Sequence, residues 1–89
     1  MATGPDATST DAEVTIRYWA SARAAAGCDS ERFSGGNVGQ ILQAAASAHA
    51  GLGGVLAIST ILLDGRPVGA GVPLSEGTTL EVLPPFAGG

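Results

Sequence analysis

The stretch that decides the fold is TTLEVLPPFAGG, residues 78–89, in which a strand pattern runs into two prolines and a final glycine pair. Apolar and polar residues alternate up to Leu83, which predicts a half-buried strand. Proline fixes φ and has no N–H, so Pro84 and Pro85 cannot continue a ladder of hydrogen bonds. The pattern therefore predicts a last strand that ends at Leu83, followed by an extended tail over residues 84–89.

The tail has the length and shape to reach into a neighbouring protein. At about 3.1 to 3.5 Å per residue, its residues span about 20 Å when extended. Phe86 and Ala87 precede Gly88 and Gly89, and the two glycines have no Cβ, so the walls of a narrow channel can approach the backbone closely. We expect the carboxylate of Gly89 to be the functional group of the chain.

The rest of the sequence predicts a ββαββ order of elements. The segment 1–12 is rich in small polar residues and is expected to be a disordered leader. The domain is expected over residues 13–83, with the tail beyond it. Its expected elements are a strand at 13–19, a short helix at 20–26, a strand at 31–33, a helix starting at Asn37 and ending near residue 49, a strand at 59–63, a return strand at 66–68 and the last strand at 78–83.

Three local signals support these boundaries. Asn37 followed by Gln40 resembles a capping box at the start of the long helix. Asp64-Gly65 is the two-residue signature of a tight hairpin. Residues 51–56 are expected to form a compact connection with at most a short turn of helix. Together the elements predict an α+β fold of the β-grasp type, a mixed sheet with one main helix across one face and the first and last strands parallel at its centre.

Composition excludes several classes of function. The 89 residues allow one domain with a modest core. The formal net charge is −4, all four basic residues are arginines, and no basic stripe is available to neutralise phosphates, so we expect no nucleic-acid partner. No apolar run is long enough to cross a bilayer, and the N-terminal segment has no features of a targeting signal. We expect a cytoplasmic protein that does not bind membranes.

The sequence does not contain the residues of a self-sufficient active site. It has one cysteine, Cys28, and one histidine, His49. Cys28 is interpreted as an isolated packed thiol, and His49 as a helix-end residue that suits the helix dipole. Cys28 has no partner in the sequence pattern for a metal site or a catalytic dyad, and a catalytic role of His49 is not expected. We therefore expect no metal site, no cofactor bound by this chain and no catalysis by the chain alone.

Three segments together resemble the small, sulfur-carrying subunit of molybdopterin synthase. They are VTIRYWASAR at residues 14–23, LLDG at residues 62–65 and LEVLPPFAGG at residues 80–89. That family is a ubiquitin-like β-grasp group, which also contains the sulfur carrier of the thiamine pathway. The proline-rich approach to the glycine pair favours the molybdopterin branch.

The resemblance implies a mechanism in which Gly89 is the reagent. An E1-like enzyme uses ATP to adenylate Gly89, a sulfurtransferase donor converts it to a thiocarboxylate, and the tail inserts into the large subunit of the synthase. There the sulfur is transferred to a pterin precursor of the molybdenum cofactor. The resemblance also implies that Pro85, Phe86, Ala87 and Gly88 contact the partner and that the catalytic side chains belong to the large subunit.

Apolar residues on the sheet face that the helix cannot cover predict a docking patch. Leu83 and Leu62, with Trp19, are the residues expected on that face. Scattered surface hydrophobic residues are the alternative interpretation of the same pattern.

Two other functions remain open from the sequence. The first is sulfur delivery to thiamine or cysteine biosynthesis, which uses the same tail chemistry with different partners. The second is a ubiquitin-like protein modifier, or a β-grasp interaction module without sulfur chemistry.

Overall fold

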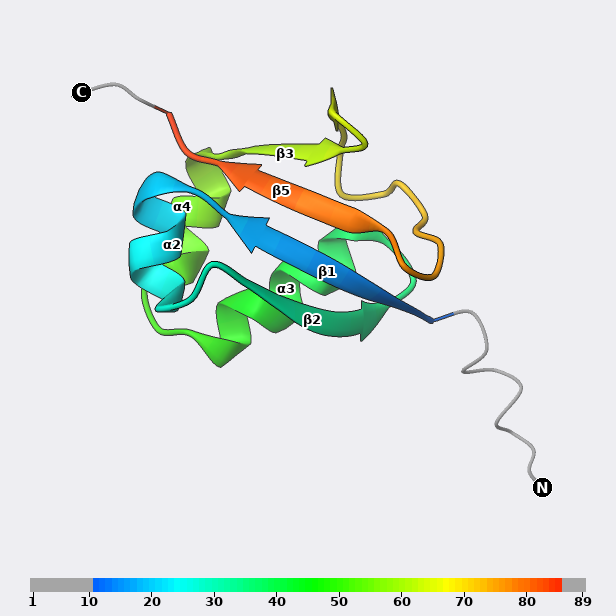
Figure 1. Cartoon of the computed structure of the whole chain (residues 1–89), viewed down its shortest axis with the longest axis horizontal. Helices are drawn as coiled ribbons and strands as arrows, with labels where there is room; N and C mark the ends of the chain where they lie inside the picture. The colour runs from blue at the N-terminus through cyan, green and yellow to red at the C-terminus, as the bar shows by residue number, and fades with distance from the viewer. Residues whose placement is uncertain (1–10, 86–89) are drawn as a thin grey trace.

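The computed structural model describes residues 11–85, which form a mixed sheet with helices behind it (Figure 1). The elements in chain order are β1 (Ala12–Tyr18), α2 (Ala20–Ala26), β2 (Ser30–Gly35), α3 (Val38–Ala48), α4 (Leu52–Ile58), β3 (Thr60–Leu63), β4 (Arg66–Pro67) and β5 (Thr79–Leu83). The described strands form one sheet in the order β2-β1-β5-β3-β4.

The first and last strands are adjacent and parallel at the centre of the sheet, as the sequence predicted. Ile16 of β1 lies opposite Leu80 of β5, and Tyr18 lies opposite Val82. On its other side each strand has an antiparallel neighbour, β2 beside β1 and β3 beside β5. Because β5 is bordered by strands on both sides, the start of the tail is fixed to the middle of the sheet.

The core lies between the sheet and the helices. In β1 every second side chain is buried, and the same alternation places Leu80 and Val82 of β5 in the core. The helix α3 contributes Val38, Ile41 and Ala45, which recur at steps of three and four residues and so form one apolar stripe. The main helix therefore covers one face of the sheet, as expected, and leaves the other face to solvent (Figure 1).

The predicted hairpin turn between β3 and β4 is confirmed. Asp64 has φ of 53° and Gly65 has φ of 81°. Two consecutive positive φ angles are required by a type I′ turn, which matches the right-handed twist of the paired strands. Asp tolerates this conformation better than most residues, and glycine adopts it without steric cost.

The predicted capping box at the start of α3 is confirmed, except that the Gln40 side chain accepts from a different backbone N–H. The side-chain oxygen of Asn37 accepts a hydrogen bond from the backbone N–H of Gln40 at 2.9 Å. The side chain of Gln40 reaches back to accept the N–H of Gly36, at 2.6 Å, rather than that of Asn37. Both bonds satisfy backbone donors that the helix leaves unpaired, so the start of α3 is well defined.

The connection after α3 is a helix of its own, which the sequence analysis did not predict. The expected compact connection over residues 51–56 is replaced by α4, seven residues long, which includes Gly53 and Gly54. Each glycine costs about 1 kcal/mol of helix propensity relative to alanine. Leu52 and Leu56 are both buried, and burial of a leucine side chain contributes about 1.5–3 kcal/mol. Packing against the core therefore outweighs local propensity.

The strand boundaries differ from the expected ones by a few residues. Ala12, assigned to the leader, belongs to β1 and is only 5% exposed. The second strand is longer than the expected 31–33, since β2 pairs with β1 over its whole length. Asp11 is exposed and precedes β1, and residues 1–10 of the expected leader lie outside the described residues. Strand boundaries depend on which residues pair with a neighbouring strand and which are buried. The identity of a single residue determines neither.

Candidate functional site

The start of the tail is held by backbone contacts at the centre of the sheet. The backbone N–H of Trp19 donates a hydrogen bond to the carbonyl oxygen of Val82 at 3.2 Å, and Leu83 lies opposite Thr60 of β3. Pro84 is buried and Pro85 is exposed. The chain therefore leaves the sheet at Pro84-Pro85, as predicted, and Pro85 is accessible to a partner.

The remaining predicted tail residues lie outside the described part of the chain. These are Phe86, Ala87, Gly88 and Gly89. Their assignment as partner-contacting residues and as the acyl carrier stays a prediction from the sequence.

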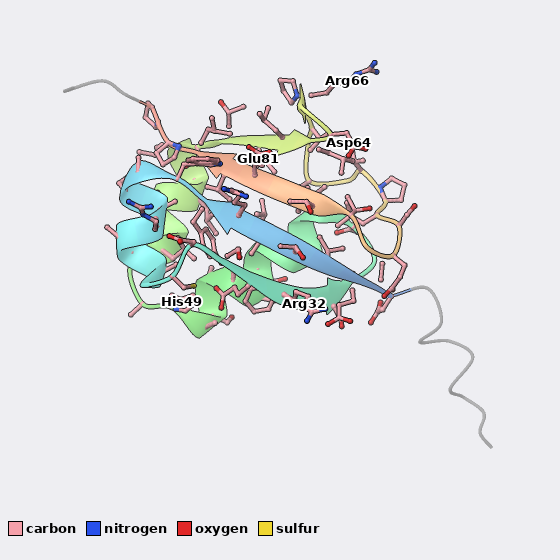
Figure 2. All side chains as sticks on the ribbon, viewed as in Figure 1. Arg32, His49, Asp64, Arg66 and Glu81 are labelled. Atoms are coloured by element: carbon pink, nitrogen blue, oxygen red, sulfur yellow. The ribbon has the colours of Figure 1, made fainter. Side chains whose placement is uncertain are left out.

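The structure brings Leu62, Leu83 and Trp19 to the face of the sheet opposite the helices. Leu62 lies opposite Glu81 in the β3–β5 pair, and the indole N–H of Trp19 donates a hydrogen bond to Glu81 at 3.2 Å. The guanidinium carbon of Arg17 lies 4.9 Å from the centre of the Trp19 ring, within the range of a cation–π interaction. Figure 2 shows Glu81 on this uncovered face. We call these five residues the open face.

The open face combines apolar contact area with fixed charges. Trp19 is 40% exposed, and Leu62 and Leu83 are half-buried. The hydrogen bond to Glu81 and the cation–π contact with Arg17 both orient the Trp19 ring, and neither contact needs a bound partner protein. An amphipathic surface of this kind, with an aromatic residue at its centre, is typical of a protein-binding site.

A second group of polar side chains lies away from the open face, where the end of α3 meets β2. Nε2 of His49 lies 2.5 Å from a carboxylate oxygen of Glu31, and the hydroxyl of Tyr18 donates a hydrogen bond to the same oxygen at 2.7 Å. Cys28 lies beside them, and ligand atoms of Cys28, Glu31 and His49 are all within 4.8 Å of one another. Cys28 packs against the core, as expected, and it also lies near two donor groups from distant parts of the sequence, which the sequence did not suggest.

Sequence reasoning missed this group because its members come together only through the tertiary fold. Cys28 lies in the loop between α2 and β2, Glu31 in β2, and His49 follows the last residue of α3. No short motif links them. The one available signal was that the only thiol and the only imidazole of the chain both follow helices that must pack on the same sheet face.

The environment of the group raises the pKa of two of its members. Burial, together with the hydrogen bond to Glu31 and the charge of that carboxylate, raises the pKa of Tyr18 well above its ordinary value. Burial and the nearby carboxylates of Glu31 and Asp29 raise the pKa of the Cys28 thiol. In both cases the fold favours the neutral, protonated side chain.

We expect the folded domain to lose stability in alkaline solution because of Tyr18. Its pKa is higher in the folded chain than the unfolded value of about 10, so the stabilisation is present in full below pH about 10 and decreases as the pH rises above it. The expected slope is at most about 1.4 kcal/mol of unfolding free energy per pH unit, and Cys28 acts in the same direction.

Ultraviolet absorbance of the phenolate tests this directly, because Tyr18 is the only tyrosine in the chain. Ionisation should coincide with unfolding measured by circular dichroism. A phenolate that forms near pH 10 while the domain stays folded would contradict the prediction.

None of the helices in residues 11–85 is long and apolar enough to span a membrane.

Five strands in this order, with parallel central strands and a main helix across one face, define the class of ubiquitin-like β-grasp proteins. Residues 16–89 match the ThiS family, so the match covers most of the domain and runs to the final glycine. The chain belongs to the ThiS family. No match was found among curated protein sequences.

Solved structures of several other proteins have a similar fold. The small archaeal modifier protein 1 of Methanosarcina acetivorans is similar with a TM-score of 0.81 and 25% identity, over 89% of this chain and 98% of that chain. The HVO 2177 protein of Haloferax volcanii has a TM-score of 0.76 and 28% identity, over 90% of this chain and 89% of that chain. Similarity extends to a complex of subunits 1 and 2 of the molybdopterin-converting factor from Helicobacter pylori 26695, with a TM-score of 0.65 and 22% identity, over 86% of this chain and 99% of that chain.

Proposed function

We propose that this chain is a sulfur carrier whose Gly89 is adenylated by an E1-like enzyme and converted to a thiocarboxylate. The observation that carries the proposal is the continuity of the ThiS family match from β1 through to the Gly88-Gly89 end. The fold supports it, because β5 lies at the centre of the sheet and directs the chain outward at Pro84-Pro85. A folded domain followed by a tail that ends in Gly89 suits a carrier protein. An enzyme would need an active site within the domain.

The chemistry of the tail requires an activating partner. A carboxylate with a pKa near 3.5 is ionised at neutral pH and is a poor electrophile. Adenylation by an ATP-dependent enzyme turns it into an acyl-adenylate and releases pyrophosphate. Sulfide-level sulfur from a sulfurtransferase donor then attacks the acyl carbon and displaces AMP, which gives the thiocarboxylate. In this proposal ATP binds the partner, and this chain supplies the acyl group and a surface for recognition.

Mass spectrometry of the intact chain tests the proposed chemistry. The purified chain is incubated with an E1-like enzyme of its host, ATP and a sulfurtransferase donor. The expected product carries sulfur in place of one oxygen of the Gly89 carboxylate. A chain whose mass is unchanged, in a reaction where the same enzyme activates its own known carrier, would count against the proposal.

We propose molybdenum cofactor biosynthesis as the pathway, with the large subunit of molybdopterin synthase as the acceptor of the tail. The similarity to a molybdopterin-converting factor complex and the proline-rich approach to the glycine pair support this choice. Complementation separates the pathways. The chain should restore molybdenum-dependent enzymes in a host that lacks the small synthase subunit, and not thiamine or cysteine synthesis in hosts that lack those carriers.

Protein modification is the second candidate, favoured by the similarity to a small archaeal modifier protein. In that case Gly89 forms an amide with a lysine of a target. The present chain contains no lysine, so the target lysine must come from another protein. Peptides in which the residues before Gly89 are joined to a lysine of another protein, isolated from the native host, would support this function.

We expect the open face to dock the large subunit, and Leu62→Glu to weaken that binding by about tenfold or more. The substitution removes apolar contact area from the open face and places there a carboxylate that loses its water when the partner binds. Titration calorimetry with the large subunit measures the change. Gln43→Glu, at an exposed position of α3, adds the same charge away from the open face and should leave the affinity unchanged. Equal affinities of the two variants would exclude this surface.

A further inference from the structure

The single cysteine and the single histidine of the chain lie at one point of the fold, together with a carboxylate. Cys28, Glu31 and His49 are each half-buried, and they come from a loop, a strand and a helix end. The side chains of His49 and Glu31 are 22% and 24% exposed, so an ion has access to them from solvent. This group lies outside the open face and the tail, and the proposed sulfur chemistry does not use it.

The three donors match the ligand preferences of one class of metal ion. Zinc binds cysteine sulfur at about 2.3 Å, histidine nitrogen at about 2.0–2.1 Å and carboxylate oxygen at about 2.0–2.2 Å. Tetrahedral geometry with these bond lengths separates the donors by about 3.3–3.6 Å. The three atoms lie within 4.8 Å of one another, and His49 and Glu31 are already in contact. Zinc binding therefore requires the Cys28 sulfur to move closer to the other two donors and the His49–Glu31 pair, now 2.5 Å apart, to open.

We propose that Cys28, Glu31 and His49 form a zinc site, with the fourth position taken by water or by a ligand from a partner. The hydroxyl of Tyr18, which donates to Glu31 at 2.7 Å, orients the carboxylate from outside the coordination sphere. Such outer contacts hold a ligand in one orientation and raise metal affinity. Tyr18 is only 2% exposed, so this contact is fixed by the core.

A catalytic relay of thiol, imidazole and carboxylate fits the arrangement less well. In a relay the imidazole stands between the other two groups, with one ring nitrogen facing each. Here the sulfur and the carboxylate oxygen are within 4.8 Å of each other as well as of the imidazole, so the imidazole does not separate the other two groups. Three donors that are all near one another fit a shared ion better than a linear relay.

The proposal predicts one zinc ion per folded chain. The full chain, free of any histidine tag, is stripped of metal, titrated with zinc chloride and measured by equilibrium dialysis with elemental analysis. Zinc should also raise the thermal unfolding midpoint, because an ion that binds only the folded chain stabilises it. Magnesium and calcium, which prefer sites made of oxygen, should bind neither as tightly nor with that effect.

Three variants and one control distinguish the proposed zinc ligands from residues that only lie near them. Cys28→Ser and His49→Gln should each weaken zinc binding by about a hundredfold or more, and Tyr18→Phe by about tenfold as an outer contact. Asp64→Asn is the matched control, because it removes a negative charge at the turn between β3 and β4, away from the three donors (Figure 2), and asparagine tolerates the positive φ there, so it should keep full affinity. Circular dichroism establishes that each variant is folded, and Cys28→Ser decides the result if His49→Gln does not fold.

Cobalt chloride gives an independent readout. Cobalt bound by a thiolate shows a charge-transfer absorption, which the Cys28→Ser variant must lack. Less than one zinc per ten chains at saturation, or equal zinc affinity of the wild type and Cys28→Ser, would overturn the proposal.

Discussion

A chain that lacks Gly89 is expected to fold normally and to form no thiocarboxylate. The core of the domain is complete by the end of β5, so loss of one tail residue leaves its packing unchanged. The shortened chain ends in Gly88, whose carboxylate stops one residue, about 3.5 Å, short of the activated position. An acyl group displaced by that distance reacts slowly even when binding is retained. Sulfur incorporation, measured by mass spectrometry, should fall below detection.

The matched control is a glycine substitution in a loop of the domain. Gly69 has open space where a Cβ would lie, and no positive φ requires glycine there. Gly69→Ala should therefore retain full sulfur incorporation, and both variants should unfold at the same temperature as the wild type. Normal sulfur incorporation by the chain without Gly89 would refute the assignment of Gly89 as the acyl carrier.

Ile41→Ala is expected to destabilise the domain by about 2–5 kcal/mol, because it leaves a cavity beneath the main helix. Ile41 is fully buried, and its Cδ1 would lie 3.1 Å from a Cβ at Gly35, so α3 packs closely on β2 at this point. Domains of this size have about 5–15 kcal/mol of total stability, so the loss is a large share. The unfolding midpoint should fall by at least about 8 °C.

Gln43→Ala supplies the comparison within the same helix. Gln43 is exposed, and alanine is an equally good or better helix former, so the change should be within about 0.5 kcal/mol. Urea denaturation of both variants measures the difference. A loss below about 1 kcal/mol for Ile41→Ala would show that the contact between α3 and the sheet contributes less than its burial suggests.

The central features of the fold were predictable because they depend on local patterns. Alternation in β1 and β5 identifies the two parallel strands, and Asp64-Gly65 identifies the hairpin through the φ angles that it permits. The helix α4 was not predictable in this way. Gly53 and Gly54 have low helix propensity, and the burial of Leu52 and Leu56 in the assembled core compensates for that cost.

The open face and the group of Cys28, Glu31 and His49 also differ in how far the sequence predicts them. Leu62 and Leu83 were predictable as members of one surface, because strand alternation determines which face a residue occupies. The proximity of Cys28 to Glu31 and His49 depends on where α3 ends relative to β2, and no sequence period encodes that distance. Donors from different elements are therefore the part of a site that sequence reasoning misses most easily.

The position of β5 between β1 and β3 also has a consequence for the order of events during synthesis. β5 is the last described element of the chain, and its partner β1 is the first, so the central pairing joins residues that are far apart in sequence. Contacts of such large separation form late and slow folding. Until residues 79–83 have left the ribosome, β1 lacks its parallel neighbour, so the central pairing of the sheet cannot form.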